Sequence, residues 1–263
     1  MAIPTGYTRR DGAEDTALVC DALAALPLSA FWDAGEALPG ALGRGGVRVL
    51  RLGGVVAVVR RYRRGGAFRR FLPDRFLSPD RAFRELELSV ALRADGLPIP
   101  EPLAALARRT RCGFELAIAT RLVANARPLP AFVAEQPGLR RATLRATGAL
   151  VARAFAAGLQ HPDLHPGNVL ARRSGNGEPE LVLIDLDRAR RLPRLTPAQR
   201  DAMLVRMARW LWRHARELPI APRTRDFAEF LRGMGLGGRG RRAEHRRLAR
   251  LVQRALRWRK HDR

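Results

Sequence analysis

The chain has 263 residues, and 46% of them are hydrophobic, which is enough to bury a sizeable core and excludes an intrinsically disordered protein. Lysine and arginine together number 49 against 25 acidic residues, which gives a formal net charge of +24. All of these basic residues except Lys260 are arginines. A surplus of this size attracts polyanions such as nucleic acid, anionic lipid and phosphorylated sugars, and charge alone does not choose among them.

Nothing in the sequence indicates export or a membrane span. Cys20 and Cys112 form no metal-type cluster and are too few for a disulfide framework. Residues 1–15 lack the charged start and the apolar core of a signal peptide. No segment approaches the roughly 20 apolar residues that cross a bilayer. We therefore expect a cytoplasmic protein that is at most attached to a membrane surface.

The first 62 residues predict a helical patch, a glycine turn and a hairpin. Residues 17–32 carry apolar side chains with a helical appearance, and a glycine-rich turn follows at 40–46. The valine-rich runs 47–52 and 55–62 are joined by Gly53-Gly54. Two short strands joined by a two-residue glycine turn predict a β-hairpin.

The segment 79–95 has the apolar periodicity of a helix. Phe83, Leu86 and Val90, with Leu92, form the apolar stripe, and Gly96 supplies a stop signal. After an extended linker, two further strands are predicted at 102–109 and 113–123.

The second half of the chain reads as mainly helical. A long amphipathic helix is predicted at 138–159, followed by a loop and a hairpin across the turn 174–179. Further helices are predicted at 196–217, 224–233 and 242–260. Strands first and helices second indicate an α+β protein. We expect the boundary near 123–130, with an antiparallel-sheet N-lobe over 1–123 and a mainly helical C-lobe over 124–263.

Three polar residues in the second half have the spacing of a phosphotransferase site. Asp163 and Asn168 are five residues apart in the loop, and Asp185 follows an apolar strand 17 residues later. Phosphoryl transfer needs a carboxylate that orients or deprotonates the attacking hydroxyl, and oxygen ligands for Mg²⁺. Asp163 fits the base, and Asn168 and Asp185 fit the metal ligands. This is the pattern of the protein-kinase catalytic loop and the metal-binding Asp that follows it.

Over roughly residues 40–215 the chain resembles the lipopolysaccharide kinase family, and most closely its 3-deoxy-D-manno-octulosonic acid (Kdo) kinase branch. The resemblance implies a protein-kinase-like bilobal fold. Its most distinctive elements are the YRRGG segment and the IDxDR ending of the apolar strand. The matching segments run in order over residues 40–215, at 43–46, 58–66, 83–102, 161–168, 183–188 and 204–213.

The resemblance also implies a nucleotide site. Gly43, Gly45 and Gly46 would let a backbone turn cover the ATP phosphates, and Glu85 would pair with the cation of the third strand. That cation would be Arg60, where the wider kinase superfamily has lysine, and Arg61 is an equally placed rival. A guanidinium bridges phosphate and carboxylate with a different geometry from an ammonium.

Several of these residues have ordinary structural explanations. Asp163, Asn168 and Asp185 could belong to a surface turn and a strand end with a salt bridge, and the inward face of the first helix could present Glu87 instead of Glu85. His161 is expected to hold the loop by hydrogen bonds, and His165 either faces substrate or is solvated.

One acidic residue and two basic segments each have two possible roles. Asp187 could support the metal site or simply pair with Arg188. The arginines of 60–70 form either a solvated face or an anion contact. The basic helix at 242–260 either packs its apolar stripe on its own domain or lies on anionic lipid.

The resemblance implies ATP- and Mg²⁺-dependent phosphorylation of the 4-hydroxyl of the Kdo sugar in Kdo-lipid IVA, in lipopolysaccharide core assembly. The expected partners are this lipid-linked anionic sugar and the anionic inner face of the inner membrane. Two alternatives remain: a kinase-fold enzyme with another core sugar, small molecule or protein as acceptor, and a non-catalytic basic protein that binds nucleic acid or membrane. Nucleic acid is not expected, because aromatic residues make up only 6% of the chain and are not interleaved with the basic ones.

Overall fold

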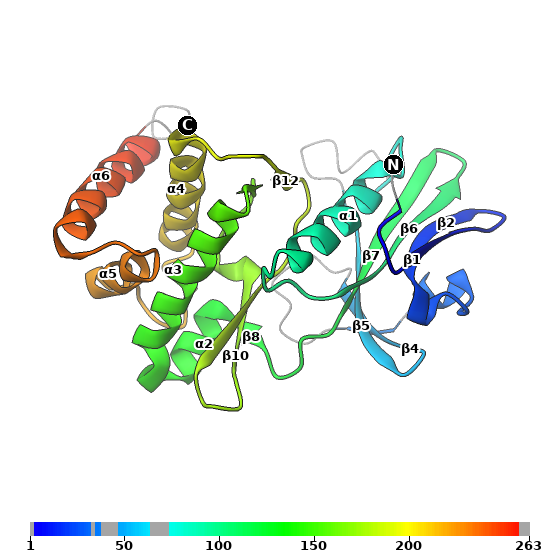
Figure 1. Cartoon of the computed structure of the whole chain (residues 1–263), viewed down its shortest axis with the longest axis horizontal. Coiled ribbons are helices and arrows are strands. Elements are labelled where there is room, and N and C mark those ends of the chain that lie inside the picture. The colour runs from blue at the N-terminus through cyan, green and yellow to red at the C-terminus, as the bar shows by residue number, and fades with distance from the viewer. Residues whose placement is uncertain (1–2, 33–34, 38–46, 64–73, 258–263) are drawn as a thin grey trace. The chain divides into compact units, whose positions relative to one another are not determined.

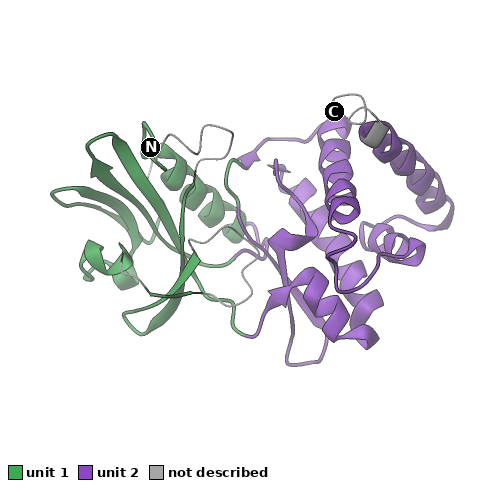
Figure 2. Ribbon diagram, turned by 180° about the vertical axis from the view of Figure 1, so that it is seen from behind, with its two compact units in different colours: residues 1–94, 100–124, 186–188 green, residues 95–99, 125–185, 189–263 purple. Residues whose placement is uncertain are grey.

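The computed structural model describes residues 3–32, 35–37, 47–63 and 74–257. The chain divides into two compact units (Figure 2). Unit 1 contains residues 1–94, 100–124 and 186–188, and unit 2 contains residues 95–99, 125–185 and 189–263. Most of the sheet therefore comes from the first half of the sequence and most of the helix from the second half.

Unit 1 is built on an antiparallel sheet with the strand order β1-β2-β6-β7-β5-β4-β3 within the described residues (Figure 1). Its strands are β1 (Tyr7–Asp11), β2 (Asp15–Cys20), β3 (Glu36–Ala37), β4 (Val47–Leu52), β5 (Val55–Arg61), β6 (Pro102–Thr110) and β7 (Gly113–Arg121). The β4–β5 hairpin turns at Gly53 and Gly54, with φ of 53° and 81°. Such a turn needs positive φ at both central positions, which glycine adopts without strain.

Both faces of this sheet are covered by apolar side chains. The helix α1 (Asp80–Ala94) packs Phe83 and Leu86 against one face, where Leu18, Leu116 and Ile118 lie. On the other face, short 3-10 turns at Asp21–Leu23 and Leu28–Trp32 add further apolar residues to the core, among them Phe31 and Trp32. Because both faces are buried, β6 and β7 are hydrophobic at consecutive positions rather than at alternate ones.

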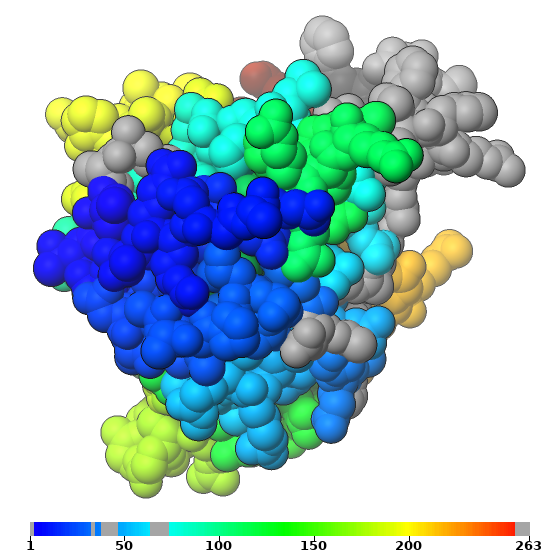
Figure 3. Space-filling model, turned by 90° about the vertical axis from the view of Figure 1, so that its right-hand side faces the viewer, coloured from blue at the N-terminus to red at the C-terminus, as the bar shows by residue number. Residues whose placement is uncertain are grey.

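The prediction of a helical patch at 17–32 is wrong. Residues 15–20 form β2, which pairs with β1 on one side and β6 on the other, and the remainder forms the two 3-10 turns. The apolar residues are buried because β2 lies between two other strands. Pairing with these strands outweighs the local preference for a helix. The N-terminal part of the chain, in blue in Figure 3, covers one face of the molecule, while Ala17, Leu18 and Val19 themselves are buried beneath the surface.

Unit 2 is mainly helical, and its described strands form a three-stranded sheet and one strand pair. Its helices are α2 (Leu129–Glu135), α3 (Arg140–Ala156), α4 (Pro197–Arg213), α5 (Thr224–Gly233) and α6 (Gly238–Arg257). Its strands are β8 (Arg127–Pro128), β9 (Leu159–Gln160), β10 (Val169–Arg173), β11 (Pro179–Leu183) and β12 (Arg190–Arg191). The sheet has the order β11-β10-β8, and the pair is β12-β9. The sequence did not predict the short helix α2. Of the three helices predicted from residue 196 on, α5 has the predicted bounds, α4 is shorter at both ends, and α6 begins at Gly238 instead of residue 242.

Two glycines allow α3 and α5 to cross closely. A Cβ atom added at Gly148 of α3 would lie 1.9 Å from the carbonyl oxygen of Phe230, and one added at Gly233 of α5 would lie 1.9 Å from that of Arg145. No side chain fits at such distances, so the crossing depends on glycine at both positions. Within the described ranges, none of the helices has the length and hydropathy needed to cross a membrane.

Candidate active site

The segment 161–168 of unit 2 is held in place by His161, which is fully buried. Its Nδ1 accepts a hydrogen bond from the backbone N–H of Asp163 at 3.1 Å, and its own backbone N–H points to Sδ of Met203 in α4 at 3.2 Å. Burial lowers the pKa of His161, despite the opposing effect of Asp185 and Asp163, so the ring is neutral near pH 7. His161 thus fixes the conformation of the loop, and its buried ring is not accessible to substrate.

Asp163 is the exposed carboxylate of this loop, with 58% of its side chain accessible. Its Oδ2 lies 3.5 Å from Nε2 of His165, and its Oδ1 lies 3.4 Å from Nη1 of Arg206 in α4. The contact with His165, together with the charge of Arg206, lowers the pKa of Asp163 in spite of partial burial. The carboxylate therefore stays ionised and can accept a hydrogen bond from a bound hydroxyl.

Asn168 and Asp185 lie at the same end of the β10–β11 hairpin. Val169 pairs with Leu183, and the backbone N–H of Ile184 donates to the carbonyl oxygen of Asn168 at 2.9 Å. Asp185 is the next residue and has a left-handed backbone, with φ of 61°. This conformation is uncommon for a residue with a side chain and is best tolerated by Asn and Asp. The hairpin thus brings together two residues that are 17 positions apart in the sequence.

The side chain of Asn168 is oriented by the segment 161–168 itself. Its Nδ2 donates to the backbone carbonyl of Asp163 at 3.1 Å, which leaves Oδ1 as the atom able to ligate a cation. The described residues contain no group of three or more His, Cys, Asp or Glu side chains that could hold a metal ion. An amide oxygen and one carboxylate fit Mg²⁺, which keeps waters and phosphate oxygens as its other ligands.

In unit 1, Arg60 of β5 forms an ion pair with Glu85 of α1. Nη2 of Arg60 lies 2.6 Å from Oε1 and 2.9 Å from Oε2, and the Glu85 side chain is only 6% exposed. The hydroxyl of Tyr62 also donates to Glu85, and the guanidinium of Arg60 lies over the Tyr62 ring, 4.6 Å from its centroid. Burial, followed by the charge of Glu85, raises the pKa of Tyr62, so its hydroxyl remains a donor.

The directions in which the side chains of β5 and α1 point decide which arginine and which glutamate form this ion pair. Arg61 points to the other side of β5, where its Nη2 donates to the carbonyl oxygen of Trp32 at 2.7 Å. On α1, Glu85 lies on the buried face with Phe83 and Leu86, whereas Glu87 is only partly buried. Arg60 and Glu85 are therefore the cation and carboxylate that meet.

We expect Glu85→Gln to lower the free energy of unfolding by about 3 kcal/mol, because it leaves a partly buried guanidinium without its carboxylate. Glu87→Gln, on the same helix but outside this ion pair, is the matched control and should cost less than about 1 kcal/mol. Urea denaturation of both variants measures the difference. Equal stabilities of the two variants would contradict a central structural role of the Arg60–Glu85 pair.

Asp187, which follows the apolar strand, does not form the ion pair with Arg188 that the sequence suggests. Asp187 pairs with Arg81 of α1, whose Nε lies 2.7 Å from Oδ1, rather than with the adjacent Arg188. Arg188 has a left-handed backbone with φ of 61° and is exposed. Asp187 thus ties the residues after Asp185 to α1, within unit 1.

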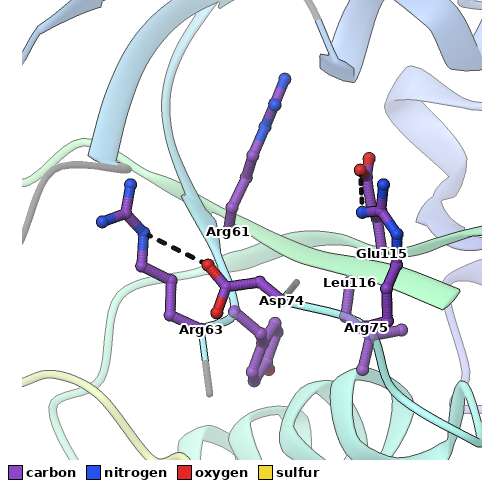
Figure 4. Close-up of a pocket in the computed structure, with 7 residues that line it drawn as sticks. Arg61, Arg63, Asp74, Arg75, Glu115 and Leu116 are labelled. Carbon is purple, nitrogen blue, oxygen red and sulfur yellow. Dashed lines mark hydrogen bonds and ion pairs between the residues drawn. The ribbon is translucent and has the colours of Figure 1, made fainter. Parts of the chain in front are cut away.

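Within the described residues, Arg61, Arg63 and Arg75 do not form an open anion site. A pocket of about 270 Å³ is lined by Arg61, Arg63 and Arg75 (Figure 4). Arg63 lies 3.9 Å from Asp74, Arg75 pairs with Glu115, and Arg61 is bound to Trp32 as described above. These arginines are already neutralised or hydrogen-bonded. Gly43, Gly45, Gly46, Arg64, Arg69 and Arg70 lie outside the described residues.

Sequence reasoning missed the contribution of α4 to the site. This helix begins with a capping box, in which Thr196 and Gln199 bind each other's backbone N–H groups. It brings Arg206 to Asp163 and stacks Trp210 on His165, with ring centroids 5.0 Å apart. The spacing of Arg206, Trp210 and His214, four residues each, was the available signal, because it places them on one helical face.

Comparison with known proteins identifies the family. The model of the lipopolysaccharide kinase (Kdo/WaaP) family matches residues 29–234. The chain belongs to this family. The family assignment agrees with the resemblance drawn from the motifs alone.

Curated relatives of the lipopolysaccharide kinase family carry a more specific name. The 3-deoxy-D-manno-octulosonic acid kinase of Xanthomonas oryzae pv. oryzae strain PXO99A is 39% identical over 150 residues, which are 56% of this chain and 58% of that protein. The protein of the same name from Stenotrophomonas maltophilia strain K279a is 34% identical over 183 residues, which are 67% and 70% of the two chains. The chain thus spans somewhat more than half the length of the Xanthomonas relatives that it matches.

The solved structure of WaaP in complex with acyl carrier protein has the same fold. It superposes with a TM-score of 0.53 at 22% identity, over 84% of this chain and 88% of that chain. At this identity the likeness concerns the fold alone. It confirms the prediction of a kinase-like bilobal α+β architecture.

Proposed function

We propose that the chain is an ATP-dependent kinase that phosphorylates the 4-hydroxyl of the Kdo sugar in Kdo-lipid IVA. The observation that carries this proposal is the arrangement in unit 2. An exposed, ionised Asp163 lies in a loop fixed by His161, and Asn168 and Asp185 lie at one end of the following hairpin. Membership of the lipopolysaccharide kinase family and the name of the Xanthomonas and Stenotrophomonas relatives support the choice of acceptor.

In the proposed reaction, Asp163 accepts a hydrogen bond from the acceptor hydroxyl and then its proton. The hydroxyl oxygen forms a bond to the γ-phosphorus of ATP while the bond from that phosphorus to the bridging oxygen of ADP breaks. The products are ADP and the phosphorylated sugar, and Asp163 returns its proton to solvent. Because the rate of such a transfer depends mainly on positioning, the rigid support of Asp163 by the buried His161 ring matters for the rate.

Asn168, through Oδ1, and Asp185 would hold Mg²⁺. When bound, the ion neutralises charge on the phosphates during transfer. In unit 1, we propose that Arg60, positioned by Glu85 and Tyr62, contacts the phosphates of ATP together with the glycine-rich segment that contains Gly43, Gly45 and Gly46. In this proposal the N-lobe (1–123) binds nucleotide and the C-lobe (124–263) supplies the catalytic groups.

Transfer of label from [γ-³²P]ATP to Kdo-lipid IVA, followed by mass analysis of the lipid product, tests the proposal. The expected result is one added phosphate on the Kdo sugar. A panel with heptose-containing core acceptors, small-molecule alcohols and a protein substrate tests the alternative acceptors. Transfer to another acceptor alone would contradict the Kdo assignment, and no nucleotide binding together with no transfer would favour a non-catalytic basic protein.

We further propose that α6 attaches the protein to the anionic inner face of the inner membrane. The apolar side of this helix is used within unit 2, since Leu248 is buried and Arg247 pairs with Asp201 and Glu244. The opposite side carries exposed arginines at nearly regular four-residue spacing, and none of them makes an ion pair within the described part of the chain. These residues are Arg239, Arg242, Arg246, Arg250 and Arg254.

We expect the triple substitution of Arg242, Arg246 and Arg250 by Gln to weaken binding to phosphatidylglycerol vesicles by about 100-fold, since each arginine near an anionic surface contributes about 1 kcal/mol. Vesicle co-sedimentation at low and high salt measures this effect, and salt should weaken wild-type binding. The control replaces three exposed arginines of unit 1, Arg48, Arg51 and Arg109, by Gln.

Equal loss of vesicle binding in both triple variants would indicate a response to net charge rather than a membrane surface on α6. WaaP was solved in complex with acyl carrier protein, so the same assay with acyl carrier protein tests a protein as the alternative ligand of this surface. Binding of acyl carrier protein by α6 without binding of vesicles would overturn the membrane assignment.

A further inference from the structure

One face of α4 lies against the loop that contains Asp163. Arg206, Trp210 and His214 are spaced four residues apart, so they share a helical face. Arg206 reaches Asp163 and Trp210 reaches His165, so this face is directed at the loop. All of these residues belong to unit 2.

The aromatic rings on this face form a continuous stack. The rings of His165 and Trp210 are nearly parallel, at 4°, and those of Trp210 and His214 have centroids 4.4 Å apart. Gly167 makes room for them, because an added Cβ would lie 3.0 Å from the Trp210 ring and 3.1 Å from the His165 ring. The stack therefore fixes His165 beside Asp163 and holds the loop against α4.

Arg206 has no comparable structural role. Its side chain is 53% exposed, and its contact with Asp163 is 3.4 Å long. An exposed ion pair of this kind contributes at most about 1 kcal/mol to stability. A cation beside a carboxylate favours its ionised form, so Arg206 does not help Asp163 to accept a proton. Neither stability nor proton transfer explains a guanidinium at this position, whereas recognition of an anion beside the reacting hydroxyl does.

We propose that Arg206 binds the carboxylate of the acceptor sugar while Asp163 binds the hydroxyl that is phosphorylated. This inference rests on the proposed function and adds to it the residue that recognises the acceptor.

Geometry favours a carboxylate on the reacting sugar over a more distant phosphate of the lipid. A hydroxyl bound to Asp163 and an anion bound to Arg206 would each lie about 2.8 Å from their protein partner. Because the two partners are themselves 3.4 Å apart, the two ligand groups lie at most about 9 Å from each other, a limit that two substituents of one sugar ring satisfy. Kdo carries a carboxylate and the proposed target hydroxyl on one ring, so it satisfies this spacing. Trp210 would act as a positioning residue through His165.

The test compares Kdo-lipid IVA with the analogue in which the Kdo carboxylate is reduced to an alcohol. We expect Arg206→Gln to raise the KM for the natural acceptor by about 10- to 100-fold, the range for loss of a charge-assisted hydrogen bond. The KM for ATP should stay within about threefold of wild type. Wild type should prefer the carboxylate acceptor, and the variant should lose this preference, with partial rescue by Arg206→Lys.

Arg200→Gln is the matched control, because Arg200 is an exposed arginine on another face of α4. Its kinetic constants should equal those of wild type. A preference for the carboxylate acceptor that persists in Arg206→Gln, or a rise in KM for ATP instead of acceptor, would overturn the inference and leave the proposed function intact. No transfer by wild type to either acceptor would instead overturn the proposed function, and the assignment of Arg206 with it.

Discussion

Asp163→Asn should lower kcat for phosphoryl transfer by about 10²- to 10⁴-fold, because the amide cannot accept the proton of the acceptor hydroxyl. The substitution preserves shape, and the hydrogen bond to His161 uses the backbone N–H of residue 163, so the loop keeps its conformation. The KM for ATP should change little. Single-turnover transfer with saturating ATP and acceptor measures the loss directly.

The control for this variant is Asp201→Asn. Asp201 is an α4 carboxylate that pairs with Arg247 instead of the loop. Its kcat should stay close to that of wild type, although its stability falls slightly. A rate for Asp163→Asn within tenfold of wild type would mean that another group accepts the proton, and the role of Asp163 would be reduced to binding.

Asp185→Asn is expected to remove the stabilisation of the protein by Mg²⁺ and ATP. At a ligand concentration of about 100 times Kd, bound nucleotide stabilises the wild-type fold by about 2.7 kcal/mol, which raises the melting temperature by several degrees. The proposed Mg²⁺ ligands are one carboxylate and one amide oxygen, so a neutral amide in place of the carboxylate should weaken binding of the ion. Thermal unfolding with ATP, with and without Mg²⁺, provides a readout that does not depend on turnover.

Asp187→Asn, two residues later, provides the matched control. It breaks the ion pair with Arg81 and should lower the melting temperature of the free protein, yet retain the rise caused by Mg²⁺ and ATP. If Asp185→Asn retains a full, Mg²⁺-dependent rise, Asp185 is not a ligand and the metal assignment is wrong. If both variants lose the rise, the effect belongs to the conformation of the segment and not to the carboxylate.

The glycine hairpin and the first long helix could be predicted well because their signals are local. Gly53-Gly54 permits only a tight turn between two valine-rich runs, and the stripe of Phe83 and Leu86 has a clear helical period. The apolar segment 17–32 could not be assigned in the same way. A buried central strand has no alternation, so its sequence resembles that of a buried helix until its neighbours β1 and β6 are known.

The sequence by itself determined the family, the two-part α+β architecture and the candidate set of Asp163, Asn168 and Asp185, because these depend on residue types at fixed spacing along the chain. The tertiary structure decided which arginine meets Glu85, which cation binds Asp187, and that α4 brings Arg206 and Trp210 to the loop. Such contacts join residues separated by 25 to 106 positions, for instance Arg60 with Glu85 and Arg81 with Asp187. They depend on how strands and helices pack against each other, which no local pattern encodes.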